Sequence, residues 1–460
     1  MAVEIHFEHG TIVVPKTDEV PEAVDKFLSL DQRSGSYRAP AQQYRDLVLT
    51  LKRDGVDFDD RARRFDPLAL ELTKKIDPFP HQAEALEKWW TAGRRGIVEL
   101  PTGAGKTILA VLAMARVQRP TLVVVPTIDL LTQWSKVLEE FFGESIGMLG
   151  GGSHDRQPIT VATYDSAQMQ IEFIGNHFGF LVCDECHHLP APAYRFIAEG
   201  SIAPFRLGLT ATLERTDGGE QTAMNLLGPL VHQVGIETLE GDYLAPYDLE
   251  SVGVHLSEEE QARYDASRSQ YLTFLRGSGV RLDRPQGWAQ FIMRAHQSDE
   301  GRAAFRAYRE QKRIAIASEA KLAALWAVLV KHREDRTIVF TEDNETVYRL
   351  SRRFMFPAIT HQTKAPERKH WLTAFAKGDV RVLLTSKVLN EGVDVPEANV
   401  GVVLSGSGSV REHVQRLGRI LRKRPGKRAV LYEIFTEVAA EVNITERRRQ
   451  HRAYQKDEPC

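Results

Sequence analysis

The chain has 460 residues, enough for about three domains, and its 42% apolar content is ordinary for domains that bury sizeable cores. Sixty basic and 62 acidic residues give a net charge of −2, which excludes a uniformly basic nucleic-acid binder and leaves only a local groove for such a ligand. Three cysteines argue against a disulfide framework, no apolar run reaches the roughly 18 residues of a membrane span, and the N-terminus has no signal pattern, so we expect a cytoplasmic protein with no membrane partner.

Residues 1–76 predict a small α+β domain. From Val3 to Phe7, apolar and polar residues alternate, which is the period of a strand, and residues 11–14 supply a partner strand after a glycine turn. Residues 41–53 predict a helix with apolar side chains along one side. A Pro-Phe-Pro segment then interrupts the chain and marks the boundary with the next domain.

Residues 77–245 and 319–445 both alternate short β-branched strands with helical segments. In each range this rhythm predicts a parallel sheet with helices on both faces. The predicted fold class is therefore α/β, with two similar lobes, of which only the first carries a phosphate-binding loop. The strands expected in the first lobe are residues 96–100, 121–125, 159–163, 180–184 and 206–210.

Residues 246–318 break this rhythm and predict a helical insertion. Ser257 and Glu260 form a capping box, a helix runs on to Arg276, and two further helices follow. Its aromatic side chains are expected to form a small core of their own, although such an insertion could also grip a nucleic-acid backbone. Residues 446–460 form a basic tail.

A phosphate-binding loop joins the first strand of residues 77–245 to an apolar helix. Backbone N–H groups of the turn and the positive end of the helix dipole form an anion site. Lys106 can reach the outer phosphates of ATP, and the Thr107 hydroxyl can hold Mg²⁺. Leu100 stands where the generic motif has its first glycine, so that motif is only partly met. The sequence Thr-Gly-Ala-Gly-Lys-Thr107 matches instead the form that nucleic-acid motors use. The other loop residues expected to bind nucleotide are Thr102, Gly103 and Gly105. Upstream, the Gln82 amide can pair with an adenine edge.

Two carboxylates, at residues 184 and 185, stand at the end of an apolar strand. Because ligands sit at the carboxyl edge of such sheets, Asp184 is expected to hold Mg²⁺ through water and Glu185 to deprotonate the attacking water. The same segment contains a C-x-x-C pattern, which would suit zinc or redox chemistry. Strand alternation places Cys183 on the face opposite Asp184, so we interpret it as a core residue.

The second lobe carries an arginine-rich helical segment. Gln415, Arg419 and Arg422 share one helix face and could stabilise charge on a transferring phosphoryl group, although a salt-laced surface helix would show the same pattern. Asp394 follows a strand and a glycine, and could accept a hydrogen bond from a ribose hydroxyl.

Several strands end in hydroxyl residues that suit phosphate contacts. Such contacts fix position and carry no sequence information, and each residue alone is an ordinary strand terminus. As a set they predict a groove that tracks a nucleic-acid strand across both lobes. They are Thr127, Thr163, Thr360 and Thr385.

The order of these motifs resembles superfamily 2 helicases, and more narrowly the XPB family in its compact archaeal or bacterial form. The resemblance rests on Gln82, on Thr102–Thr107, on Asp-Glu-Cys-His187, on Glu-Gly-Val-Asp394 and on Gln415–Arg422. It implies two RecA-like lobes with a thumb-like insertion, and an N-terminal damage-recognition domain. It also implies an ATP- and Mg²⁺-dependent DNA motor of 3′→5′ polarity, used in nucleotide excision repair near the nucleoid with a partner nuclease.

One departure from the family pattern lies after Thr-Ala-Thr212. The family has Arg-Glu-Asp, which is proposed to help split the duplex, whereas this chain has Arg215, Thr216 and Asp217. The resemblance implies that Arg215 and Asp217 contact nucleic acid, but the missing carboxylate puts strong strand separation in doubt. Three alternatives therefore stay open: a double-strand translocase, a nucleotide-gated scaffold that recruits a nuclease, and an RNA helicase, since phosphate contacts do not separate DNA from RNA.

Overall fold

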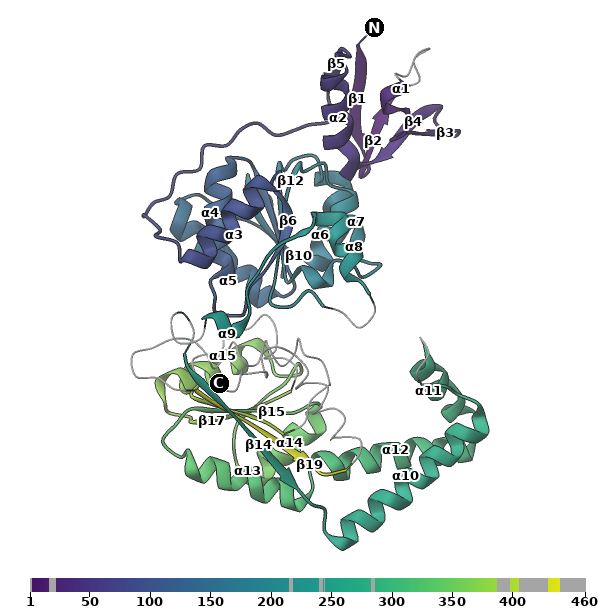
Figure 1. Ribbon diagram of the computed structural model, residues 1–460, viewed down its shortest axis with the longest axis vertical. Coiled ribbons are helices and arrows are strands. Elements are labelled where there is room, and N and C mark those ends of the chain that lie inside the picture. Colours follow the sequence, from purple (N-terminus) through teal and green to yellow (C-terminus); the bar gives the residue numbers. More distant parts are fainter. Residues whose placement is uncertain are drawn as a thin grey trace, which may run out of the picture. The chain divides into compact units, whose positions relative to one another are not determined.

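The computed structural model describes residues 2–15, 22–214, 218–239, 243, 245–282, 286–386, 398–404 and 429–438 (Figure 1). The described residues divide into two compact units, one that ends at Leu239 and one that follows it. None of the helices in these ranges is long and apolar enough to cross a membrane.

The N-terminal domain is a twisted sheet covered by one main helix. Within the described ranges its strand order is β3-β4-β2-β1-β5, and β1 and β2 form the expected antiparallel hairpin. Helix α2, the predicted helix, packs Leu47 and Leu51 onto Ile5 and Ile12. The elements are β1 Val3–Glu8, β2 Thr11–Val14, α1 Glu22–Asp25, β3 Ser29–Asp31, β4 Ser36–Pro40, η1 Ala41–Gln43, α2 Tyr44–Arg53 and β5 Phe58–Asp60.

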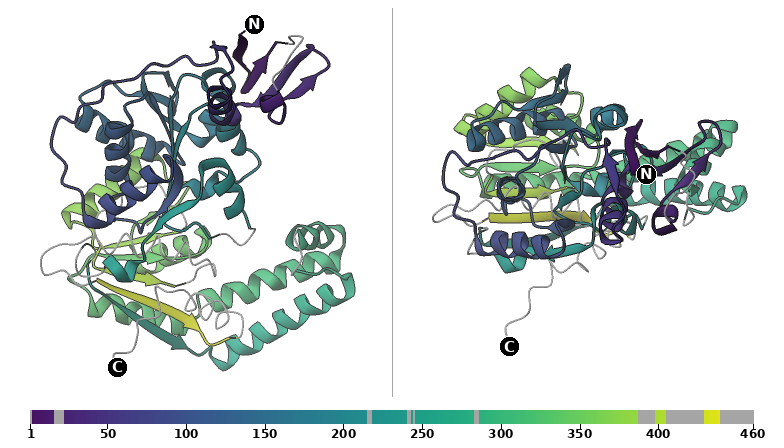
Figure 2. Two further views of the ribbon diagram at one scale, coloured as in Figure 1. Left: turned by 45° about the horizontal axis from the view of Figure 1, so that its top comes forward. Right: turned by 90° about the horizontal axis from the view of Figure 1, so that it is seen from above.

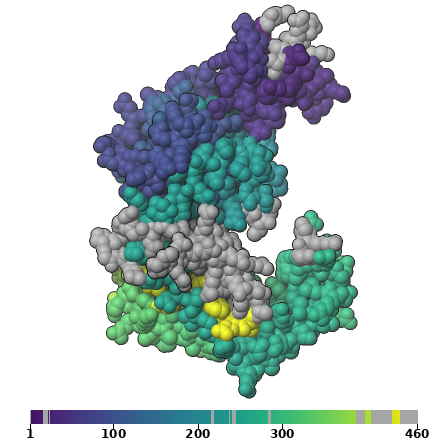
Figure 3. All heavy atoms as spheres, in the orientation of Figure 1, coloured from purple at the N-terminus to yellow at the C-terminus, as the bar shows by residue number. Residues whose placement is uncertain are grey.

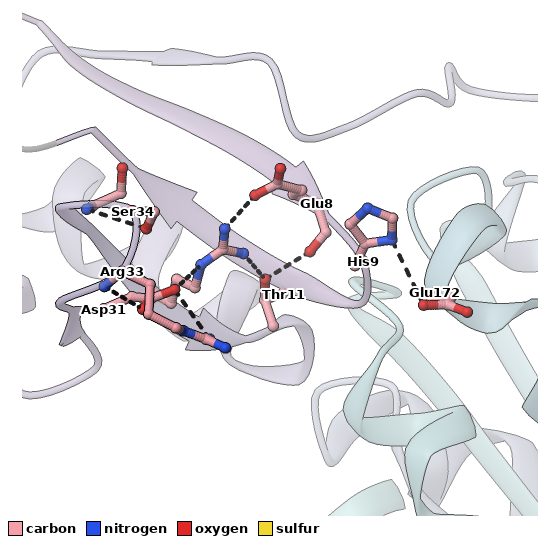
Figure 4. Close-up of polar contacts among 9 residues, drawn as sticks. Glu8, His9, Thr11, Asp31, Arg33, Ser34 and Glu172 are labelled. Atoms are coloured by element: carbon pink, nitrogen blue, oxygen red, sulfur yellow. Dashed lines mark hydrogen bonds and ion pairs between the residues drawn. The ribbon is translucent and has the colours of Figure 1, made fainter.

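A polar network ties the hairpins of this domain together (Figure 4). The Arg38 guanidinium donates to Asp31 Oδ2 at 3.1 Å, to Thr11 Oγ1 at 3.0 Å and to Glu8. The Arg33 guanidinium donates to Asp31 Oδ1 at 3.0 Å and lowers the pKa of that carboxyl to about 2. Because these groups are exposed or half-buried, the network sets the geometry of the loop more than it stabilises the fold.

The N-terminal domain packs on the first lobe (Figure 3). Ile202, which belongs to the first lobe, is buried in the core of the N-terminal domain. The Asn176 side chain donates to the Ala62 carbonyl at 2.8 Å, and His9 Nδ1 lies 3.6 Å from Glu172 Oε2 (Figure 4). The two parts therefore share both apolar and polar contacts.

Gly10 lies against Phe196 at this contact, and Gly10→Ala is expected to destabilise the protein. Its φ is +75°, and an added Cβ would lie 2.6 Å from the Phe196 ring. We expect the free energy of unfolding to fall by about 1–3 kcal/mol in denaturant titrations. Gly35→Ala is the matched control, because Gly35 has φ +69° with nothing within 4 Å and should show only the backbone term of about 1 kcal/mol. Equal losses in both variants would contradict the clash with Phe196.

The first lobe is a mainly parallel sheet with helices on both faces. Its described strands have the order β13-β6-β12-β11-β7-β10-β8-β9, and all pairs except β8–β9 are parallel. Helices α3 and α4 cover one face and α6, α7 and α8 the other (Figure 1). All five predicted strands are confirmed. The strands are β6 Arg95–Glu99, β7 Thr121–Val125, β8 Gly147–Gly150, β9 Ser153–Asp155, β10 Ile159–Thr163, β11 Phe180–Asp184, β12 Phe205–Thr210 and β13 Leu230–Gln233. The helices are α3 Pro80–Thr91, α4 Lys106–Val117, α5 Ile128–Phe142, α6 Tyr164–Ile174, η2 Cys186–His188, α7 Arg195–Glu199, α8 Glu220–Leu227 and α9 Ile236–Leu239.

The second unit holds a second parallel sheet. Its described strands have the order β14-β19-β18-β15-β17-β16, and every pair is parallel. Strand β14 falls in residues 246–318, yet it pairs along its whole length with β19. The elements are β14 Tyr247–Val254, α13 Glu319–Lys331, β15 Thr337–Phe340, α14 Asn344–Phe354, β16 Ala358–Ile359, α15 Ala365–Lys377, β17 Val382–Thr385, β18 Val400–Val403 and β19 Ala429–Thr436. The α/β class with two RecA-like lobes is thus confirmed.

After β14, the described residues of the insertion form three helices. They are α10 Glu258–Ser278, α11 Gly287–Gln297 and α12 Asp299–Ile316, and α10 and α12 lie side by side (Figure 2). The capping box predicted at Ser257 and Glu260 is present. Tyr271 and Phe291 are buried together at the centre of a local cluster, so the expected small aromatic core is confirmed.

Candidate active site

The loop between β6 and α4 adopts a backbone that only glycine tolerates well. Gly103 has φ +88° and Gly105 φ +82°, both in the left-handed region. An added Cβ at Gly105 would lie 2.1 Å from the Gln82 amide nitrogen. Because Gly105 directly precedes α4, the unpaired N–H groups of the first helical turn are left at the loop, where they form an anion site.

Gly105→Ala is expected to weaken ATP binding at least about tenfold, because the loop must open around both the clash and the strained backbone. The measurement is calorimetric titration with a non-hydrolysable ATP analogue. Gly55→Ala serves as control, since Gly55 has a similar φ of +66° with nothing within 4 Å. Wild-type affinity in Gly105→Ala would contradict the close packing of loop and amide.

The Gln82 side chain forms hydrogen bonds with the backbone of the loop. Its Nε2 donates to the Ala104 carbonyl at 3.1 Å and to that of Gly105 at 3.3 Å, while its Oε1 accepts from the Phe79 N–H at 3.0 Å. The side chain is buried. Both ends of the amide are thus engaged with the chain itself, and the adenine contact expected from the sequence stays a prediction.

Lys106 and Glu185 meet at the carboxyl edge of the sheet. Lys106 Nζ donates to the Leu100 carbonyl at 3.2 Å and lies 3.9 Å from Glu185 Oε1. Glu185 Oε2 lies 3.4 Å from His187 Nδ1, which is itself 3.0 Å from Thr210 Oγ1. Glu185 has φ +48°, a left-handed conformation that strains a residue with a side chain and often marks a functional site. The structure therefore gathers the predicted phosphate-binding lysine and water-activating carboxylate in one place.

Asp184 is held by three neighbours. Trp134 Nε1 donates to Oδ2 at 2.9 Å, the Glu185 N–H donates to Oδ1 at 3.1 Å, and the Tyr164 hydroxyl donates to the Asp184 carbonyl at 3.0 Å. Burial, with a smaller contribution from the charge of Glu185, raises the pKa of Asp184 to about 6, while the nearby Lys106 opposes the rise. A buried carboxylate with a second carboxylate beside it favours a bound cation.

The donors at this place fit Mg²⁺ better than zinc. Mg²⁺ prefers oxygen ligands, keeps several waters, and is bound through one or two side chains together with substrate phosphates. Asp184 and Thr107 offer such oxygens. In the part of the chain that the structure describes, no three His, Cys, Asp or Glu side chains are grouped to hold a metal ion. Cys183 and Cys186 both lie in the apolar core, where burial raises the pKa of each thiol, so the interpretation of Cys183 as a core residue is confirmed.

Thr210 and Thr212 form the turn after β12. Thr210 Oγ1 donates to the Thr212 carbonyl at 2.9 Å and accepts from the Thr212 N–H at 3.2 Å. Thr210 also lies against His187, so the Thr-Ala-Thr segment reaches the carboxylate pair through one histidine. The sequence did not reveal this link, because nothing in the spacing says that His187 turns toward the neighbouring strand.

The four threonines expected to contact nucleic acid are placed unequally. Thr127 Oγ1 caps α5 by accepting from Leu130 N–H at 3.3 Å, and Thr163 Oγ1 caps α6 by accepting from Ser166 N–H at 3.2 Å. Since β7 and β10 are neighbours, both caps lie at one edge of the first lobe. Thr360 and Thr385, at adjacent strand ends in the second unit, are fully buried. Because the backbone of each residue is covered as well, the nucleic-acid contacts expected at those two positions stay predictions.

Six of the predicted site residues lie outside the described residues, and their roles stay predictions. They are Arg215, Asp217, Asp394, Gln415, Arg419 and Arg422.

Three family profiles match successive parts of the chain. They are the Xeroderma pigmentosum group B helicase damage recognition domain at residues 5–62, the type III restriction enzyme res subunit at 75–215, and the helicase conserved C-terminal domain at 320–424. The helicase domains imply an ATP-dependent activity.

Curated relatives point to the same family. The chain is 39% identical over 416 residues to the "DNA 3'-5' translocase XPB2" of Sulfurisphaera tokodaii, covering 90% of this chain and 94% of the relative. It is 30% identical to the "DNA 3'-5' helicase XPB" of Mycobacterium tuberculosis, covering 82% of this chain but only 63% of that longer protein.

A solved structure supports the fold. The helicase domain of Pyrococcus furiosus Hef matches with a TM-score of 0.53 at 19% identity, covering 81% of this chain and 98% of that one. At this identity the match shows the shared fold alone. Together with the geometry at Lys106, Asp184 and Glu185, the profile matches and the 39% identical relative show that the chain belongs to the XPB family of superfamily 2 DNA helicases.

Proposed function

We propose that the protein is a DNA-dependent ATPase that moves along DNA with 3′→5′ polarity, as a helicase or translocase in DNA repair of the nucleotide-excision type. The observation that carries this proposal is the meeting of Lys106 and Glu185 beside the glycine loop, 3.9 Å apart. A lysine for the phosphates and a carboxylate for the water are the parts that ATP hydrolysis needs.

In the proposed reaction the loop N–H groups and Lys106 bind the ATP phosphates. Asp184 and Thr107 would hold Mg²⁺, which when bound neutralises charge on the phosphate oxygens. Glu185 orients the attacking water and accepts its proton as the oxygen attacks the terminal phosphorus and the ADP oxygen leaves. His187, 3.4 Å from Glu185, holds that carboxylate in place.

DNA is the proposed track because the curated relatives carry DNA in their names. The "DNA 3'-5' translocase XPB2" and the "DNA 3'-5' helicase XPB" are named for DNA, and an Arabidopsis thaliana relative is named a subunit of transcription and repair factor IIH. Within the first lobe we propose that Thr127 and Thr163 face the DNA backbone. Residues 1–76 are proposed as the damage-recognition domain, residues 246–318 as the thumb, and a nuclease as the partner. A cytoplasmic, nucleoid-associated location stays a prediction.

The test is ATP turnover by the full chain with no nucleic acid and with single-stranded, duplex, forked and damaged DNA, or RNA. We expect DNA to raise kcat and RNA to do so less. Equal turnover with and without DNA would overturn the motor proposal. A rate too slow to support stepping would favour the nucleotide-gated scaffold instead.

A double-strand translocase that does not separate strands is the second candidate. Thr216 replaces the central carboxylate of the family's Arg-Glu-Asp segment, and the 39% identical relative is named a translocase. Release of a labelled strand from a fork would favour a helicase. Displacement of a triplex-forming strand from duplex DNA without fork opening would favour the translocase.

A further inference from the structure

Two aromatic side chains from different helices converge on Asp184. Trp134 of α5 donates its indole N–H to Oδ2 at 2.9 Å, and Tyr164 of α6 donates its hydroxyl to the backbone carbonyl at 3.0 Å. Both side chains are fully buried, with 1% and 2% of their surfaces exposed, so water does not compete for either bond. The carboxylate and the peptide group of Asp184 are therefore oriented by two separate helices.

The same two helices begin at the proposed DNA edge. Thr127 caps α5 and Thr163 caps α6, and the neighbouring strands β7 and β10 place these caps side by side. Tyr164 directly follows its cap, and Trp134 lies in the second turn of α5, about 10 Å along the helix axis. A helix is stiff over so short a distance, so a shift of its first turn is carried to the aromatic residue.

We propose that Trp134 and Tyr164 are positioning residues, through which nucleic acid held at the first turns of α5 and α6 changes how tightly Asp184 holds the metal–nucleotide complex. This inference rests on the proposed function, because it takes Asp184 as a metal-binding group and the two caps as nucleic-acid contacts. It adds a route between them that runs within the first lobe.

Such a route is measurable as a coupling factor. If nucleic acid changes the affinity for nucleotide by some factor, nucleotide must change the affinity for nucleic acid by the same factor. Replacing a residue that only supports the fold would change the nucleotide affinity by the same factor with and without nucleic acid, so the ratio of these two affinities would stay the same. The ratio therefore separates a positioning role from a structural one.

The experiment uses the full chain and a non-hydrolysable ATP analogue with Mg²⁺. Its dissociation constant is measured by calorimetry with and without a saturating single-stranded oligonucleotide, and the ratio of the two constants is the coupling factor. Trp134→Phe keeps an aromatic ring but removes the N–H donor. We expect its coupling factor to fall to within about twofold of one, and its Mg²⁺-dependent nucleotide affinity to weaken by about tenfold, the size of a lost bond to a charged group.

The chain offers a matched control in Trp89. This residue is also 1% exposed in the first lobe, and its indole donates at the same 2.9 Å, but to the Arg206 carbonyl away from the nucleotide site. Trp89→Phe should keep the wild-type coupling factor. Tyr164→Phe removes a single hydroxyl and should bring the coupling factor closer to one, as Trp134→Phe does. If Trp134→Phe does not fold, Tyr164→Phe tests the inference alone.

Three outcomes overturn the inference: a wild-type coupling factor kept by both Trp134→Phe and Tyr164→Phe, an equal loss in Trp89→Phe, or a coupling factor of one in the wild-type protein. Whether the proposed function stands is read separately, from the dependence of ATP turnover on DNA in the wild-type protein.

Discussion

Lys106→Ala is expected to abolish ATP turnover, with kcat/KM reduced by about a thousandfold, while DNA binding is retained. Lys106 is the first residue of α4, and its side chain is nearly buried. Its ammonium lies 3.9 Å from Glu185. In the proposed reaction this ammonium stabilises the transferring phosphoryl group, so its removal should lose stabilisation that appears mainly in the transition state. The measurements are steady-state ATP hydrolysis and DNA binding by fluorescence anisotropy.

Lys88→Ala provides the control for Lys106→Ala. Lys88 is an exposed lysine of the first lobe, paired with Glu84 at 2.7 Å, and its loss should leave turnover nearly unchanged. A Lys106→Ala protein that hydrolyses ATP within tenfold of the wild-type rate would place the phosphate site elsewhere.

Glu185→Gln is expected to lower kcat by about 10²–10⁴-fold while ATP still binds. The amide has nearly the same shape as the carboxylate but cannot accept the proton of the attacking water. Losing the negative charge also removes one cause of the raised pKa of Asp184, so that carboxyl should ionise more readily and nucleotide with Mg²⁺ should bind at least as tightly. Single-turnover hydrolysis and calorimetric nucleotide binding measure the two halves of this expectation.

Glu139→Gln is the corresponding control, because Glu139 lies on the exposed side of α5 in the same lobe. Its turnover should match that of the wild-type protein. If Glu185→Gln lost ATP binding and hydrolysis together, Glu185 would be a structural residue and not the base.

Local patterns predicted most of the fold. The strands at residues 121–125, 159–163 and 180–184 were visible because each is a short β-branched run between turns, which depends only on neighbouring residues. Strand β14 was harder, because its partner β19 lies far along the chain and no local period reports such pairing. Its residues therefore fell into the range assigned to the helical insertion.

The grouping of the candidate site residues was predicted only in part, and their roles stay predictions. Lys106, Asp184 and Glu185 could be placed because the motif order and the carboxyl edge of a parallel sheet bring them together. Trp134 could not, since on sequence alone it is one more apolar residue on the inner side of a helix, and its hydrogen bond depends on tertiary packing. The burial of Thr360 has the same origin, because a strand end looks accessible until the surrounding loops are known.

The burial of Ile202 beneath the first sheet has a practical meaning for anyone who shortens this protein. Deleting the N-terminal domain would expose an apolar patch on the first lobe, and such patches promote aggregation in solution. A trimmed motor that misbehaves would therefore say little about whether the removed piece handles lesions. Pairing the cut with a polar replacement at that isoleucine would separate the two effects.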